Sequence, residues 1–420
     1  MEDSVLTHID IIFMNYNKLS NIERSYLFLS WILFFHIFRN ISLIGYATIL
    51  LLAYAYIYVK YSHSLLNKRI PISSAIFIIT LFWVPLVSTF YLPIDEYITA
   101  LLRYFVPTLF LLLSCLYQNQ YTVSLIRQIM RSMCIFSTLA ALSLPYQILF
   151  GKISFFADSS MRNGSIRYSS LMGSLTTFGT CGAICVAILA FSGNVLFKWN
   201  TKTILIILNV LGLCLTLQKA AIINLVIICF MLVLLSRIKI NISSIIKFFI
   251  MVVAMLFVSY IVYNYTSLGE YISTSVNYTL GEGNDTENDL ISRLWSTPMS
   301  VYNKNDMNIL SVFLGIGFKA LAGTMGLPQY PMNHNNYFDL LFSGGIISLI
   351  IVIFLLLKTI ISILKKDKNS WTNWDKIYML SIILILINMF IGAGTFYHPF
   401  MAILFSIMAF SYNAVKNIKI

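Results

Sequence analysis

The chain has 420 residues, of which 59% are hydrophobic and only 10% are charged, and its mean hydropathy is +0.82. These values exclude an ordinary soluble domain and predict that lipid surrounds most of the chain. The formal net charge of +12 does not indicate nucleic-acid binding, because lysine and arginine lie mainly in short segments between apolar runs.

Apolar runs of about 15 to 22 residues recur along the chain, which favours helices over the shorter strands of a membrane barrel. We therefore predict an all-α fold, a polytopic transmembrane helical bundle of about twelve spans. The predicted spans are Ser25–Phe38, Ile41–Val59, Pro71–Tyr91, Ile98–Tyr117, Ile129–Phe150, Ser169–Phe191, Thr203–Leu217, Ala220–Leu235, Phe248–Asn264, Asn336–Leu357, Ile377–Ile391 and Phe400–Val415. The first of them is expected to be a membrane anchor rather than a cleavable signal peptide, because a second apolar run follows it.

Basic residues mark alternate connections between these spans, as Lys68 and Arg69 do after the second span and Lys365 and Lys366 do after the tenth. By the positive-inside rule, these connections and both chain termini face the cytoplasm. The chain then divides into transmembrane helices one to nine (1–264), a large loop on the opposite side of the membrane (265–335), and transmembrane helices ten to twelve (336–420).

The large loop is far longer than the few residues that usually connect helices, so it is either functional or disordered. Its Leu290–Tyr302 segment has the apolar spacing of a helix, which predicts a short amphipathic helix lying at the membrane surface. All six cysteines lie in or beside apolar runs and none lies in this loop, so no disulfide framework is expected.

His334 ends the large loop at the predicted membrane boundary, directly before the apolar helix that begins near Asn336. A neutral imidazole at this depth can accept a proton from an attacking sugar hydroxyl, and an ordinary pKa of about 6.5 suits a general base at neutral pH. A histidine that only caps the following helix would show the same pattern, so its position leaves both interpretations open. His398 is interpreted as structural, and His36 and His63 have still less claim to a functional site.

Four short motifs follow one another in the second half of the chain. They are Leu215-Thr216-Leu217-Gln218-Lys219-Ala220-Ala221, Ser292-Arg293-Leu294-Trp295, Leu314-Gly315-Ile316-Gly317, and His334-Asn335 followed after nine residues by Gly345. In this order they resemble the motifs of the O-antigen polymerase and O-antigen ligase superfamily. The chain departs from the usual pattern at Lys219, where arginine is common, and at Ser348, where glycine, threonine or tyrosine is often found. The resemblance extends from about Ser154 to the C-terminus.

The resemblance implies a glycosyltransferase of the bacterial inner membrane that uses neither a metal ion nor a cofactor. Such an enzyme transfers an undecaprenyl-diphosphate-linked oligosaccharide at the periplasmic face. The acceptor is the hydroxyl of a second lipid-linked glycan in a polymerase, or of the lipid A core in a ligase. His334 and Arg293 would be catalytic, with Asn335 and Trp295 supporting them. Membrane lipid and a chain-length regulator protein are further implied partners, and of the two activities we favour the polymerase.

The predicted topology places Arg162, Arg167, Lys219 and Arg293 on the periplasmic side, where the positive-inside rule disfavours basic residues. Solvated loop charges explain any one of them, but four together match the need to neutralise a lipid diphosphate without a divalent cation. We therefore assign the first three to binding of the diphosphate. Arg103 lies inside a predicted span near its periplasmic end, where a contact to the same diphosphate and a snorkelling side chain explain it equally well.

Two other classes of function compete with this interpretation. A transporter or lipid flippase fits the number of spans. However, Asp339 alone among the acidic residues lies within a predicted span, whereas ion-coupled transporters keep acidic residues near the midplane. A metal-dependent glycosyltransferase would need acidic ligands in an external loop, for which Asp95 and Glu96 are the candidates.

Overall fold

The computed structural model describes residues 19–66, 69–156, 160–162, 165–173, 175–216, 218–235, 295–331, 335–391, 396–416 and 418. The all-α prediction is confirmed, since 79% of the described residues are helical. The helices up to the large loop are α2 (Asn21–Phe34), the 3-10 helix η1 (His36–Asn40), α3 (Leu43–Leu66), α4 (Ile72–Ser88), α5 (Ile94–Tyr117), α6 (Val123–Phe150), α7 (Leu175–Phe191), α8 (Trp199–Leu215) and α9 (Lys219–Leu235). They are followed by α12 (Thr297–Lys304), α13 (Ile309–Leu314), η4 (Gly317–Leu321), α14 (Ala322–Met325), α15 (Asn336–Leu364), η5 (Lys368–Ser370), α16 (Asn373–Ile391), α17 (Pro399–Phe410) and α18 (Tyr412–Val415).

Several helices have the length and composition of membrane spans. Within the described part of the chain, five helices are long and apolar enough to cross a membrane: Leu43–His63, Ile94–Tyr117, Val123–Phe150, Asn336–Leu364 and Asn373–Phe390. Five more apolar helices are shorter: Ile72–Ser88, Thr177–Phe191, Trp199–Leu215, Ala220–Leu232 and Pro399–Phe410. A membrane-embedded helical bundle is therefore supported, whereas five such helices do not establish twelve spans. The predicted span Phe248–Asn264 lies outside the described residues.

Helix boundaries shift from the predicted ones where capping residues act. Helix α6 begins at Val123 instead of Ile129, because the Thr122 side chain caps it by accepting a hydrogen bond from the Leu125 N–H. It ends at Phe150, and the next residue, Gly151, has a φ of 91° in a region that favours glycine. The first predicted span, Ser25–Phe38, is broken, since α2 ends at Phe34 and the chain continues as η1.

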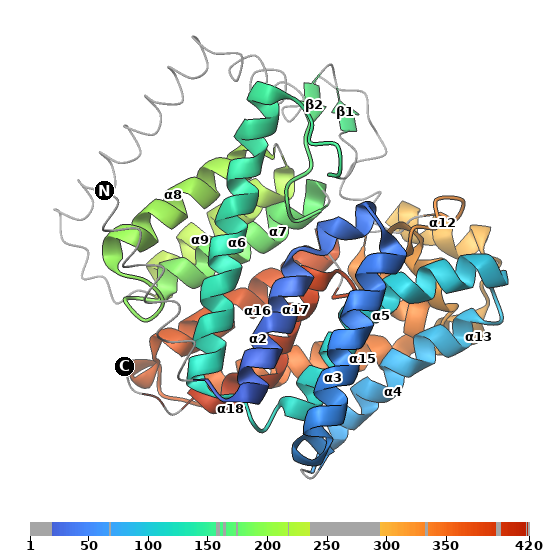
Figure 1. The fold of residues 1–420 in the computed structure, drawn as a ribbon, viewed down its shortest axis with the longest axis horizontal. Helices are drawn as coiled ribbons and strands as arrows, with labels where there is room; N and C mark the ends of the chain where they lie inside the picture. Colours follow the sequence, from blue (N-terminus) through green and yellow to red (C-terminus); the bar gives the residue numbers. More distant parts are fainter. Residues whose placement is uncertain are drawn as a thin grey trace.

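Helix α17 lies inside the bundle, and nearly all of its side chains are buried. It packs against α2, α5 and α15, which come from distant parts of the chain (Figure 1). The Phe400 ring of α17 lies 5.4 Å from that of Phe34 and 6.1 Å from that of Phe136, measured between centroids. The start of α17 therefore lies at the same level as the end of α2 and the middle of α6.

Buried polar side chains link helices within the bundle. Asn224 of α9 and Asn388 of α16 donate to each other's side-chain oxygens at 3.0 and 2.9 Å, and Thr180 of α7 donates to Asn388 at 3.1 Å. Ser137 of α6 donates to Asn209 of α8 at 2.5 Å. In hydrocarbon, such bonds join helices because lipid offers no other partner for these groups.

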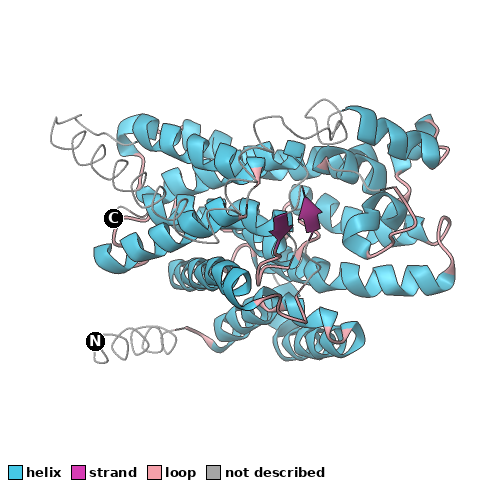
Figure 2. Cartoon of the chain, turned by 90° about the horizontal axis from the view of Figure 1, so that it is seen from above, coloured by secondary structure: helices cyan, strands magenta, loops and turns pink. Residues whose placement is uncertain are grey.

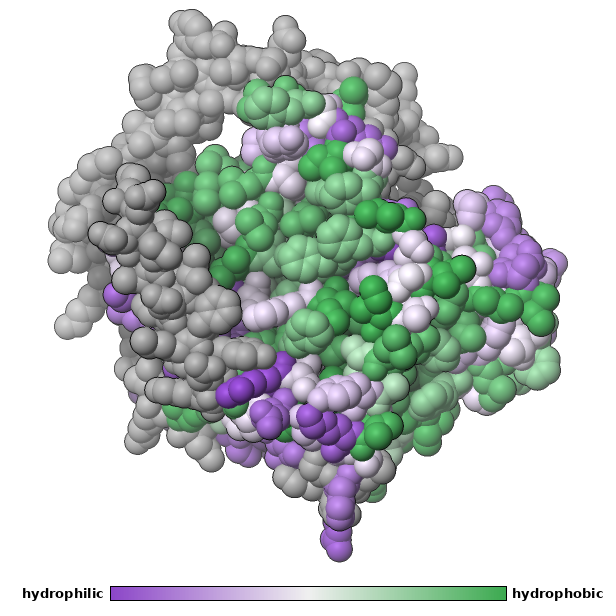
Figure 3. Space-filling view, viewed as in Figure 1, coloured by the Kyte–Doolittle hydropathy of each residue, from purple (hydrophilic) through white to green (hydrophobic). Residues whose placement is uncertain are grey.

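The outer faces of α3, α4 and α5 expose large apolar side chains, as a lipid-facing surface does. Val59 of α3 is 82% exposed and Ile79 of α4 is 64% exposed. Figure 3 shows that apolar residues dominate the described part of this face, while hydrophilic residues gather mainly toward its lower edge and its upper right.

A hairpin that the sequence did not predict follows α6. Strands β1 (Ser160–Arg162) and β2 (Ser165–Arg167) pair antiparallel, with Ser160 opposite Arg167 and Arg162 opposite Ser165. The hairpin lies beside the C-terminal end of α6 (Figure 1). Figure 2 looks onto that end of the molecule and shows the two strands near its centre. Two of the predicted diphosphate-binding arginines thus belong to neighbouring strands.

Candidate functional site

The two residues predicted to be catalytic, His334 and Arg293, lie outside the described residues, so their roles stay predictions. The neighbouring Asn335 is buried and caps α15, because its side chain accepts a hydrogen bond from the Tyr337 N–H at 3.0 Å. Its carbonyl oxygen also accepts one from the Asp339 N–H at 3.0 Å. Asn335 therefore holds the point at which the chain enters α15, next to the predicted base.

Trp295 lies just before α12 and is 64% exposed. The predicted amphipathic helix Leu290–Tyr302 is observed in part as α12, since residues 290–294 lie outside the described residues. Helix α12 buries Val301 and exposes Met299, as an amphipathic helix does. An exposed indole at this position can stack on a sugar or lie in the interfacial region of the membrane, and its supporting role stays a prediction.

The Leu314–Gly317 motif packs directly against α15 at Gly345, the glycine that completes the His-Asn motif. Gly345 interrupts α15 with φ 74° and ψ −177°, a conformation that is almost confined to glycine. A Cβ atom there would lie 2.0 Å from the Phe313 carbonyl oxygen. A Cβ atom at Gly315, whose φ is 87°, would lie 2.3 Å from the Ser343 carbonyl oxygen. Both glycines are needed because two backbones touch here.

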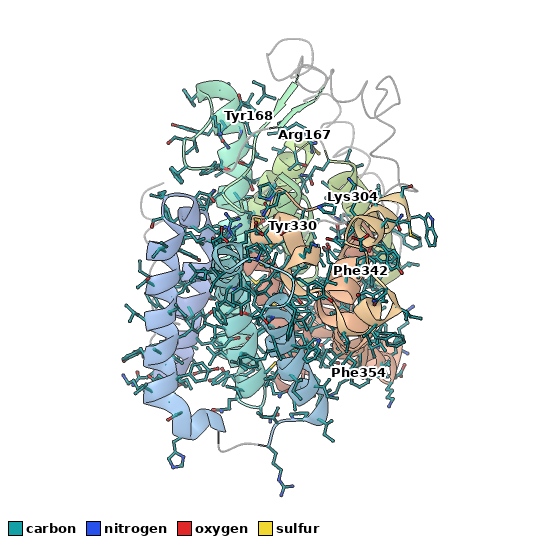
Figure 4. The ribbon with its side chains drawn as sticks, turned by 90° about the vertical axis from the view of Figure 1, so that its right-hand side faces the viewer. Arg167, Tyr168, Lys304, Tyr330, Phe342 and Phe354 are labelled. Atoms are coloured by element: carbon teal, nitrogen blue, oxygen red, sulfur yellow. The ribbon has the colours of Figure 1, made fainter. Side chains whose placement is uncertain are left out.

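Hydrogen bonds complete this contact between the two motifs. The Ile316 N–H donates to the Phe342 carbonyl oxygen at 2.6 Å, a group that the kink in α15 leaves available. The Trp83 indole N–H of α4 donates to the Leu314 carbonyl oxygen at 2.7 Å. Figure 4 shows Phe342 on this side of the bundle. Non-helical backbone is stable beside membrane helices only where protein groups satisfy it in this way.

Arg167 lies beside the turn that leads to Lys219. Its Nη2 donates to the Thr216 carbonyl oxygen at 3.4 Å, and Lys219 is the first residue of α9. Arg162 lies on strand β1, which pairs with the strand of Arg167. Arg167 and Tyr168 lie at the end of the molecule that carries the hairpin (Figure 4). The backbone thus brings three of the predicted diphosphate-binding residues to one end of the bundle.

Arg103 projects from α5 against the segment that follows α14. A Cβ atom at Gly326 would lie 2.3 Å from Arg103 Cζ, so the guanidinium group packs on this glycine, whose φ is 75°. The Arg103 Nε atom is buried and has no hydrogen-bond partner among the described residues. The Tyr330 hydroxyl of the same segment donates to Glu96 Oε2 at 2.9 Å. Glu96, one of the two acidic residues considered as metal ligands, is thus already hydrogen-bonded within the protein. These contacts favour an enclosed role for Arg103 over a snorkelling one.

The structure also brings together two histidines that the sequence predicts to be structural. The ring centroids of His36 and His398 are 4.4 Å apart and the rings are nearly perpendicular. Both side chains are buried where η1, the N-terminus of α17 and Gly173 meet. A Cβ atom at Gly173 would lie 2.7 Å from His36 Nε2 and 3.6 Å from His398 Nε2. No local pattern in the sequence joins residues this far apart. His36 lies near the end of the first predicted span, and His398 lies between the last two.

Among the residues that the structure describes, no group of three or more histidine, cysteine, aspartate or glutamate side chains could hold a metal ion. No protein-family model matches this chain, and a comparison with curated proteins finds no match. The functional assignment therefore depends on the motifs and on how the fold arranges them.

Proposed function

We propose that the protein is a polytopic glycosyltransferase of the bacterial inner membrane, of the O-antigen polymerase type. The observation that supports this most is the contact between two motifs of the resemblance, Leu314–Gly317 and Gly345. Motifs that match a family by chance have no reason to meet in space, whereas these two interlock through glycines that their close approach requires. In the proposed topology the chain has about twelve spans and both termini are cytoplasmic.

In the proposed reaction, the His334 imidazole takes the proton of an acceptor hydroxyl as that oxygen attacks the anomeric carbon of the donor glycan, with inversion. The bond between that carbon and undecaprenyl diphosphate breaks, and basic side chains stabilise the departing negative charge. These side chains are Arg293, Arg162, Arg167, Lys219 and Arg103. Asn335 supports the base by holding the start of α15, and Trp295 offers a stacking surface for a sugar.

An ion-coupled transporter is less well supported. The acidic residues within the described helices all lie in first turns, which places them toward helix ends and away from the midplane. They are Glu23, Asp95, Glu96, Asp339 and Asp375.

The function is tested by deleting the gene in its source bacterium and separating the lipopolysaccharide on gels. A core that bears one repeat unit is the expected phenotype of a missing polymerase, whereas a bare core would indicate a ligase. Complementation with wild type is expected to restore the ladder, and complementation with His334→Ala is expected to fail.

His63→Ala is the matched control, because this histidine is exposed at the predicted cytoplasmic end of α3 and the substitution is the same. It is expected to restore a full ladder. A normal ladder with His334→Ala would refute the assignment of the general base.

A further inference from the structure

The buried histidine pair lacks the hydrogen bonds that burial normally requires. The His36 Nδ1–H donates to the Leu33 carbonyl oxygen at 3.2 Å, which leaves Nε2 as the available nitrogen. Among the described residues, this Nε2 and both ring nitrogens of His398 make no hydrogen bond of normal geometry, although the Met172 backbone lies close to both rings. His36 is fully buried and His398 is 8% exposed. Buried polar atoms without partners are rare, and a ligand is one of their ordinary explanations.

Two arginines lie near the pair. Arg39 follows His36 by three residues in η1, and side chains with that spacing eclipse one another in a 3-10 helix. Burial and then the Arg103 charge lower the pKa of Arg39 to about 10, which puts the two guanidinium groups within electrostatic reach of each other. In the described part of the chain, neither arginine forms an ion pair with an acidic side chain.

The same region contains a helix N-terminus. His398 is the N-cap residue of α17, but its side chain makes no capping hydrogen bond. The positive end of the α17 dipole therefore lies at His398, and because Pro399 has no N–H, the free donors of the first turn are the Phe400 and Met401 N–H groups. Tyr104 and Tyr397, the sequence neighbours of Arg103 and His398, have ring centroids 5.2 Å apart, so α5 and the start of α17 meet at this level.

We propose that His36, Arg39, Arg103 and His398 form a binding site for phosphoryl groups on the predicted periplasmic side of the bundle. Two guanidinium groups and a helix N-terminus match the charge of a diphosphate. The two available imidazoles can add hydrogen bonds, whereas the arginines disfavour a metal cation. Binding of phosphoryl groups at this site depends only on these four residues. The assignment of the site as a subsite for the lipid diphosphate rests on the proposed function.

Binding at this site is coupled to protonation. Burial, followed by the Arg39 charge, lowers the pKa of His36 to about 3, and burial, His36 and Arg39 lower the pKa of His398. Both rings are thus neutral at pH 7, and a bound anion raises their pKa values by favouring the charged form. Affinity is therefore highest below the histidine pKa values of the complex and falls as the pH rises through them. Arg39 and Arg103 stay charged in that range, so the histidines are the protein groups of this site that titrate. The terminal phosphate of a diphosphate also titrates near about pH 6, so the histidine contribution is the difference between the pH dependence of wild type and that of a variant without the two histidines.

The site is tested by calorimetric titration of the detergent-solubilised full-length protein with farnesyl diphosphate, between about pH 5.5 and 8. The wild-type affinity is expected to increase as the pH falls. Arg39→Gln and Arg103→Gln are each expected to weaken binding about tenfold to a hundredfold, as loss of a charged hydrogen bond does. The matched control is Lys304→Gln, which removes a charge from α12 in the predicted periplasmic segment and is expected to leave the affinity unchanged. The double variant His36→Gln/His398→Gln is expected to lose the gain in affinity at low pH and to keep only the pH dependence of the ligand's terminal phosphate.

Related ligands identify what is recognised. Inorganic pyrophosphate is expected to compete with farnesyl diphosphate, and farnesol, which lacks phosphate, is expected not to bind. The site is overturned by equal binding of farnesol, by a lack of competition from pyrophosphate, or by a pH dependence that is the same in wild type and in His36→Gln/His398→Gln. It is also overturned if Lys304→Gln weakens binding as much as Arg39→Gln does.

The comparisons with pyrophosphate and farnesol need no variant, so they decide whether phosphoryl groups are recognised even if a substitution prevents folding. Glycosyl transfer is not measured in this titration. A normal lipopolysaccharide ladder with His334→Ala would therefore refute the assignment of the general base without affecting the test of the phosphoryl site.

Discussion

Gly345→Ala is expected to loosen the predicted periplasmic segment from the bundle. An alanine held at φ 74° and ψ −177° costs about 1 to 3 kcal/mol in backbone strain. Its Cβ atom would lie 2.0 Å from the Phe313 carbonyl oxygen, so the end of α13 must move away. That movement breaks the Ile316 to Phe342 and Trp83 to Leu314 hydrogen bonds, at about 1 kcal/mol each. The expected loss in the free energy of unfolding is therefore about 3 to 5 kcal/mol.

The loss is measured by titrating the protein in dodecyl maltoside micelles with sodium dodecyl sulfate and following the helical circular dichroism. Gly45→Ala is the matched control, because Gly45 is exposed near the start of α3 and a Cβ atom there meets first the end of the Ser42 side chain, at 3.1 Å. Alanine is favoured over glycine within a helix, so the control is expected to unfold at the wild-type concentration or slightly above it. If Gly345→Ala unfolds together with wild type and the control, the motif contact contributes nothing to stability.

Three further outcomes are expected. Asp375→Asn should lower the free energy of unfolding in the same titration by about 3 kcal/mol, because buried Asp375 loses its ion pair with Lys366. The control Asp95→Asn, at the exposed start of α5, should change this free energy little. Equal effects of the two substitutions would refute the role of the ion pair. In intact membranes, Lys304→Cys should react with a membrane-impermeant maleimide and Phe313→Cys should not. The reason is that Phe313 is 53% exposed on α13, beside the lipid-facing side of α4. Equal labelling of the two cysteines would place α13 in water. Transfer by purified protein should survive EDTA, and a loss that magnesium restores would contradict the metal-free mechanism.

Much of the helical framework could be predicted because it depends on local properties. The start of α15 at Asn336 was predicted at the observed residue, since a polar run there meets a long apolar one and Asn335 is a good capping residue. The all-helical class followed from the length of the apolar runs, because a backbone in hydrocarbon must bond to itself. Charges between spans indicated the orientation, which remains a prediction.

Other features were not predictable because several segments create them together. The kink at Gly345 follows no proline and arises where α13 and α15 touch, so periodicity along α15 alone continues straight through it. The β1–β2 hairpin is too short to show a strand pattern.

The order of amino acids was enough to predict a bundle of apolar helices with a histidine motif and an arginine motif in its longest polar loop, because helix formation in lipid depends on each segment separately. Tertiary structure alone decided which motifs touch and which side chains share a site. Gly315 meets Ser343 beside Gly345 because α13 packs against α15, and His36 meets His398 because α17 packs against α2. Contacts between segments depend on packing in three dimensions, and no local pattern along one segment records them.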